Sequence, residues 1–116
     1  MKPLSESILT SVAKVVVGSD NEIEAFESDL IMYINAELMT LGQMGVGKEN
    51  FRITGDTEVW TDFIEDEDKL AAIQECVTLK VKLVFDPPTS SAALESLKEI
   101  IREDEWRLMI KDDPAS

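Results

Sequence analysis

Acidic side chains are the most numerous groups in this sequence that could carry out chemistry, because 24 residues are Asp or Glu. Acid–base catalysis needs two carboxyls in one cleft whose pKa values are driven apart. Nothing in the sequence marks such a pair, and the run Glu-Asp-Glu-Asp at 65–68 is typical of a solvated surface. The acidic segments 56–58 and 65–68 also lack the twelve-residue spacing and central glycine of an EF-hand. The carboxylates therefore favour neither catalysis nor calcium binding.

Histidine and cysteine add little catalytic potential. The chain has no histidine, so the commonest general base and the commonest metal ligand are both missing. Its single cysteine, Cys76, can form neither an internal disulfide nor a zinc site. Because Cys76 falls on an apolar stripe, we expect a buried, unreactive thiol. The sequence thus predicts no enzyme activity, no cofactor and no metal.

A glycine-rich segment, Gly42 to Lys48, is superficially similar to a phosphate-binding loop. It fails the Walker pattern because Glu49, rather than Ser or Thr, follows Lys48. In addition, a predicted helix precedes the segment where a phosphate loop would follow a strand. We interpret the segment as a helix stop followed by a flexible turn.

The charge balance limits the kinds of partner that the chain can bind. With 24 acidic and 11 basic residues, the net charge is -13. Neutralising phosphates requires clustered Lys and Arg, so the balance argues against gripping nucleic acid and against docking on an anionic membrane. A length of 116 residues with 44% hydrophobic and 30% charged residues predicts one folded domain, 1–116. The apolar runs are too short to span a membrane.

Apolar residues at spacings of three and four predict four helices and therefore an all-α fold. The second helix starts at a Ser-x-x-Glu capping box, Ser19 to Glu22, and stops at Gly42. A serine, Ser90 or Ser91, is the expected N-cap of the fourth helix. The expected ranges are about 4–16, 19–41, 68–85 and 90–110.

The third predicted helix is expected to lie at the centre of the fold, because two apolar stripes require two packing partners. One stripe holds Leu70, Ile73, Val77, Val81 and Val84, and the other holds Ala72, Cys76, Leu79 and Leu83. Lys80 falls between the stripes. Either its apolar stem packs while its ammonium stays exposed, or it forms a salt bridge to a neighbouring subunit.

Residues 42–64 follow no sustained period, so they predict a long loop. The alternation Phe51-Arg52-Ile53 allows a short strand or β-bridge within it. We expect Trp60 and Phe63 to anchor this loop, and residues 109–116 to form a loose C-terminal tail.

Trp106 is the strongest candidate for a contact with another protein. On a helical projection it lies opposite the apolar stripe of the fourth helix, among charged residues that include Arg102. Such a tryptophan either covers the edge of the fold or anchors a protein partner, and both interpretations remain open here. Lys80, Lys82 and Trp60 complete the set of candidate subunit or partner contacts.

Four blocks of sequence together resemble the head-tail connector proteins of tailed bacteriophages and of prophages in Gram-positive hosts. The most specific are VTLKVKLVFDPPTSS at 77–91 and EWRL at 105–108. Upstream are DLIMYINAELMTLGQMGVG at 29–47 and WTDFI at 60–64. The resemblance covers about residues 7–109.

The resemblance implies a small helical protein without catalytic residues that assembles beneath the portal vertex. Such proteins form rings of about twelve subunits in the particle. The implied partners are further copies of the chain, the portal protein, and a stopper or tail-completion protein. DNA would pass through the ring without specific binding. The implied location is the neck of the virion, and the bacterial cytoplasm before assembly.

The acidic charge also supports a different class of function. An acidic regulatory protein or DNA-mimic inhibitor would occupy a basic cleft on its target. Such a protein would be a monomer or dimer, and its binding to a basic partner would be tight and sensitive to salt. A connector would instead assemble into a ring on the portal.

Overall fold

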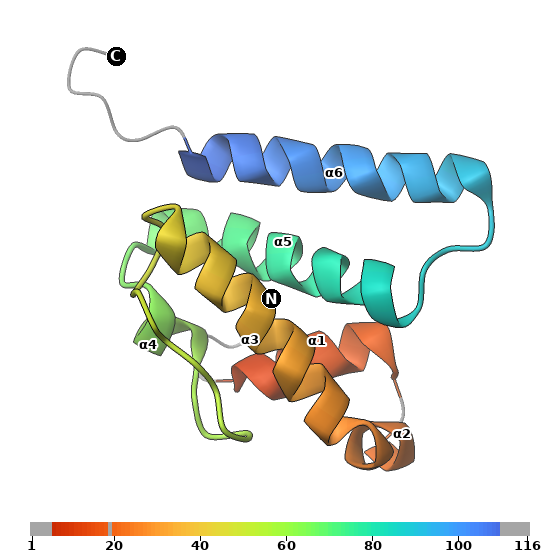
Figure 1. Cartoon of the computed structure of the whole chain (residues 1–116), viewed down its shortest axis with the longest axis horizontal. Helices are drawn as coiled ribbons and strands as arrows, with labels where there is room; N and C mark the ends of the chain where they lie inside the picture. The colour runs from red at the N-terminus through yellow and green to blue at the C-terminus, as the bar shows by residue number, and fades with distance from the viewer. Residues whose placement is uncertain (1–5, 19, 110–116) are drawn as a thin grey trace.

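The computed structural model describes residues 6–18 and 20–109, and these form the predicted all-α fold. Figure 1 shows the helices stacked around one long helix, with the last helix lying along its outer side. The elements are α1 (Ile8–Val16), α2 (Asp20–Ala25), α3 (Glu27–Gln43), α4 (Trp60–Phe63), α5 (Glu67–Phe85) and α6 (Ser91–Met109). None of the described helices is long and apolar enough to cross a membrane.

Helix α1 begins at Ile8, later than the predicted start near residue 4, and residues 1–5 lie outside the described part of the chain. Ser7 is the N-cap, because its side chain accepts a hydrogen bond from the backbone N–H of Thr10 at 3.0 Å. The helix ends before Gly18, which has a φ of +88° and donates to the Ala13 carbonyl at 3.1 Å. The predicted glycine stop is thus confirmed.

The predicted second helix is divided at Phe26 into α2 and α3, which corrects the expectation of one helix over 19–41. Phe26 has a φ of -109° and a ψ of 13°, outside the α-helical range, and its ring packs edge-on against Phe85 with centroids 5.1 Å apart. The apolar spacing continues across this turn, so periodicity alone does not reveal it. Ser19, the expected capping residue, lies outside the described residues.

The segment between α3 and α4 is a structured loop, as predicted. The side chain of Asn35 holds its middle: Nδ2 donates to the Ile53 carbonyl at 3.0 Å, and Oδ1 accepts from the Ile53 N–H at 2.7 Å. Gly47, at a φ of +77°, lies against the Phe63 ring so closely that any Cβ would collide with it.

The end of the loop is anchored in the core. Trp60 and Phe63 are both buried, which confirms their predicted role, although they also form the short helix α4 that the sequence did not predict. The Trp60 indole N–H donates to Ser11 Oγ at 2.8 Å. The β-bridge of this region pairs Val59 with Ser7, rather than involving residues 51–53. Pairing with the start of α1 is a tertiary contact that local alternation cannot indicate.

Helix α5 is the central element, as its two stripes predicted, because it packs against α1, α3, α4 and α6. Ile73, Cys76, Val77 and Val81 along it are fully buried. Val84 is an exception: it was placed on a stripe, but its side chain is 57% exposed. Its neighbour Phe85, at the end of the helix, packs against Phe26 and Tyr33, so this end of α5 is held by Phe85 rather than by Val84.

Helix α6 lies along α5 and has no other extensive partner among the described helices (Figure 1). Ser90 caps it by accepting from the Ala93 N–H at 3.2 Å. Its inward stripe buries Leu97, Ile101 and Leu108. Met109 belongs to the helix, so the predicted tail at 109–116 starts one residue too early; residues 110–116 lie outside the described chain.

Candidate subunit-contact surfaces

The outward face of α6 carries an exposed apolar patch. Trp106 is 68% exposed and lies on the side of the helix away from α5, as the sequence predicted. Met109, one turn further along, is also exposed. Neither side chain belongs to the buried stripe, so the packing of α6 on α5 does not need them. An exposed tryptophan on a helix that is already packed on its other side is typical of a protein-contact surface.

Charged residues surround this patch. Arg102, one turn before Trp106, forms an exposed ion pair with Glu99. Glu103 is exposed and forms no ion pair with any residue that the structure describes. The patch therefore has the arrangement of an interface, with an aromatic centre and a charged rim.

Lys80 joins three helices within one chain. Its Nζ lies 2.6 Å from Glu105 Oε2 on α6 and 3.3 Å from Glu37 Oε1 on α3. Burial by itself lowers the pKa of the Lys80 ammonium, but the hydrogen bond to Glu105 and the nearby Glu37 outweigh it and raise the pKa overall. The ammonium is thus neither free in solvent nor in need of a carboxylate from another subunit. Sequence spacing could not show this, because the three residues are far apart in the chain.

Asp104 lies on the inward stripe of α6 and is not among the candidate residues predicted from the sequence. Asp104 is 1% exposed, and its carboxyl lies beside Glu75 of α5, with Arg107 Nη1 3.9 Å from Oδ1. Burial, followed by the neighbouring Glu75, raises the pKa of Asp104 to about 7. When both carboxyls are ionised, Oδ2 has no donor among the described residues; when one is protonated, the two can share a hydrogen bond.

The structure also shows the surroundings of the remaining candidate residues, Trp60, Lys82 and Cys76. Trp60 is 1% exposed, so the structure corrects its selection as a contact residue: its indole ring is part of the core. Lys82 pairs with Asp86, the C-cap residue of α5, at 3.6 Å. Cys76 is buried, and burial raises the pKa of its thiol to about 12. The described chain contains no cluster of three or more side chains able to hold a metal ion.

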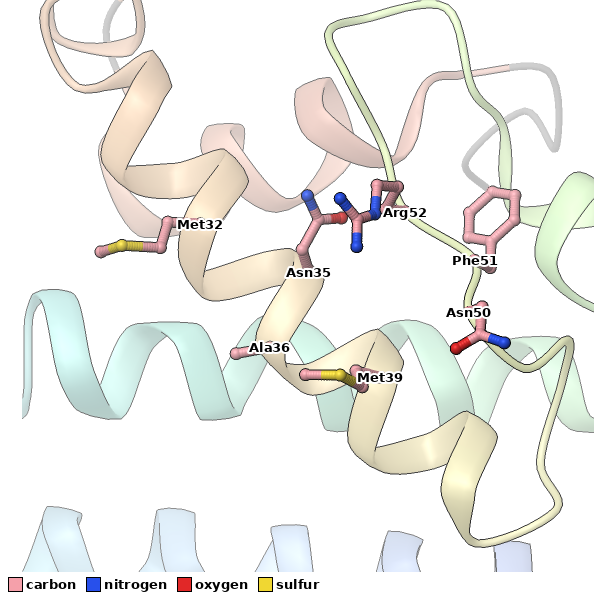
Figure 2. A pocket seen from close by; sticks show the side chains of 7 residues that line it. All are labelled: Met32, Asn35, Ala36, Met39, Asn50, Phe51 and Arg52. Carbon is pink, nitrogen blue, oxygen red and sulfur yellow. The ribbon is translucent and has the colours of Figure 1, made fainter.

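A groove of about 330 Å³ lies between α3 and the loop segment 50–52. Figure 2 shows its α3 wall and the facing loop wall, which together are formed by Met32, Asn35, Ala36, Met39, Asn50, Phe51 and Arg52. None of these side chains is a nucleophile or a carboxylate. The groove therefore offers apolar contact and one guanidinium rather than catalytic chemistry.

Comparison with known proteins matches residues 8–115 to a family described as phage connector protein. The chain belongs to this family. The match covers the whole described fold apart from its first two residues, and it confirms the resemblance inferred from the sequence. No curated protein and no solved structure matches the chain.

Membership of the phage connector family gives the chain a structural role of the connector type. The surfaces described above fit such a role. They offer an exposed apolar patch on α6 and a groove between α3 and residues 50–52, on a chain with a net charge of -13.

Proposed function

We propose that this phage connector assembles as a ring on the portal, extends the DNA channel, and uses the outward face of α6 for contacts between neighbours. The observation that carries the proposal is Trp106, exposed opposite a stripe that is already buried against α5. Truncating a tryptophan at the centre of an interface commonly costs about 2 kcal/mol or more. In a closed ring the same contact recurs at every subunit, so a small loss at one contact is repeated around the assembly.

The partners in this proposal are copies of the chain, the portal protein on one side, and a stopper or tail-completion protein on the other. A ring of about twelve subunits would match the symmetry expected at a phage neck. The net charge of -13 per chain fits a DNA conduit, because acidic walls do not retain phosphates and let the duplex slide. The protein would act in the virion neck after a period in the host cytoplasm.

The test is the variant Trp106→Ala. Since the tryptophan lies outside the core, we expect a normal helical circular dichroism spectrum and at least about a tenfold loss of co-sedimentation with the portal. Val84→Ala is the matched control, because Val84 is also an exposed apolar residue but lies on α5. A Trp106→Ala variant that is folded and co-sediments normally would show that the ring contacts lie elsewhere.

The acidic inhibitor is the second candidate, and only the charge of the chain favours it. It predicts no portal binding and a monomer or dimer at all concentrations. Co-sedimentation of the unmodified protein with the portal therefore separates the two functions before any variant is made.

A further inference from the structure

The groove on α3 has one fixed wall and one adaptable wall. The two hydrogen bonds between Asn35 and the Ile53 backbone hold the loop at its distance from α3. Phe51 is braced by the buried Phe63, with ring centroids 5.4 Å apart. On the helix wall, Met32 and Met39 are exposed, and an unbranched methionine side chain can adapt its shape (Figure 2). A preformed hollow edged by methionines can fit closely around a large apolar side chain.

The groove also differs from the rest of the surface in charge. The chain carries 24 carboxylates, yet none of them lines this groove. Arg52 is exposed at its edge and forms no ion pair with any described residue. The occupant that fits is therefore a large apolar group with a carboxylate beside it.

The outward face of α6 presents that combination. Trp106 supplies the large apolar group, and Glu103, one turn earlier on the same face, supplies a carboxylate without an ion-pair partner among the described residues. A volume of about 330 Å³ is at the small end of ligand sites, so it suits one large side chain rather than a whole helix.

Trp106 is 68% exposed and does not line the groove of its own chain. Helices α3 and α6 pack on different sides of α5 (Figure 1). A contact between the two surfaces must therefore join two copies head to tail. Such a heterologous contact uses two different patches on each copy and closes into a ring when the rotation allows.

We propose that the groove formed by Met32, Met39 and Phe51 receives Trp106 of a second copy of this chain, with Arg52 facing Glu103 of that copy. This inference rests on the proposed ring, and it names the surface that receives the α6 patch. In such a ring, each subunit inserts its Trp106 into the groove of one neighbour and receives Trp106 of the other neighbour in its own groove.

The first experiment is cysteine cross-linking between copies. Met39→Cys places a thiol in the groove, and Met109→Cys places one a turn from Trp106; the buried Cys76 does not interfere. Under mild oxidation, a mixture of the two variants on portal should give a disulfide-linked pair of unlike chains. A mixture of Val84→Cys with Met109→Cys is the control and should give none. Cross-linking of Met109→Cys with itself would overturn the proposal, because it would show a symmetric contact.

The second experiment is a charge exchange. Arg52→Glu and Glu103→Arg should each reduce assembly on the portal about tenfold, and the double variant should recover most of that loss. Lys69→Glu changes the net charge by the same amount as Arg52→Glu but lies at the start of α5, and it should have little effect. If the double variant shows no recovery, Arg52 and Glu103 do not meet and the proposal is wrong.

The outcomes separate this inference from the proposed ring. If Trp106→Ala weakens assembly while Met39→Glu and Arg52→Glu do not, the ring stands and the groove is not its receptor. If the groove variants weaken portal binding but no cross-link joins two copies, the occupant is the portal protein, and the second-copy proposal is overturned. If neither surface affects assembly, both proposals fail.

Discussion

At the scale of single residues, Asp104 stands out because a carboxyl occupies a core position between α5 and α6. Its neighbours are Glu75 from α5, and Glu103 and Arg107 from its own helix. A buried carboxyl that is ionised without a full set of donors destabilises the folded state. The raised pKa follows directly, because protonation removes the charge and lets the two carboxyls share a hydrogen bond.

Because the pKa of Asp104 is raised in the folded state, we expect the free energy of unfolding to fall as the pH rises. The unfolded pKa is near 3.8 and the folded pKa is raised to about 7, so the folded state binds the proton more tightly. Its contribution is therefore present below about pH 4 and is lost as the pH rises to about 7. Asp104→Asn should be more stable than the unmodified protein at pH 8 by roughly 1 to 3 kcal/mol, with a smaller gain at pH 5.

Urea denaturation at both pH values measures this difference. Glu95→Gln, which removes an exposed charge from the same helix, is the matched control and should change stability by less than about 0.5 kcal/mol. An equal change in stability for Asp104→Asn at pH 5 and pH 8, or a loss of stability at pH 8, would contradict the assignment.

At the scale of secondary-structure elements, α5 organises the fold because every other long helix packs on it. Val77 lies at its middle and is 0% exposed. Val77→Asp should unfold the protein, since an unpaired buried charge costs several kcal/mol, which is about the whole stability of a small domain. Val84→Asp makes the same change on the same helix at a position that is 57% exposed, and it should remain folded.

Circular dichroism and thermal melting distinguish the two variants. A cooperative melt for Val77→Asp close to that of the unmodified protein would contradict the central place of α5. Unfolding of Val84→Asp would mean that the exposed end of α5 contributes more to stability than its exposure indicates.

At the scale of the whole molecule, the net charge opposes assembly of identical copies. Each chain carries -13, so neighbours in a ring repel one another over a distance set by the salt. Raising the salt from about 50 mM to about 500 mM should therefore strengthen association of the connector with itself. An acidic inhibitor bound to a basic cleft would respond in the opposite direction.

Sedimentation velocity at the two salt concentrations measures the effect, with and without portal. Weaker self-association at high salt would contradict the prediction and favour the acidic-inhibitor interpretation.

By itself, the sequence determined the features that depend on local spacing: the all-α fold, the central place of α5, the burial of Cys76 and the outward position of Trp106. Helical period assigns each side chain to a face, and that assignment survives folding. The tertiary structure alone decided the turn at Phe26, the pairing of Lys80 with Glu37 and Glu105, the contact of Asp104 with Glu75, and the groove between α3 and residues 50–52. Most of these features join segments that are distant in the chain, and the turn at Phe26 coincides with the packing of its ring on Phe85. Their geometry depends on how helices cross, which no local period encodes.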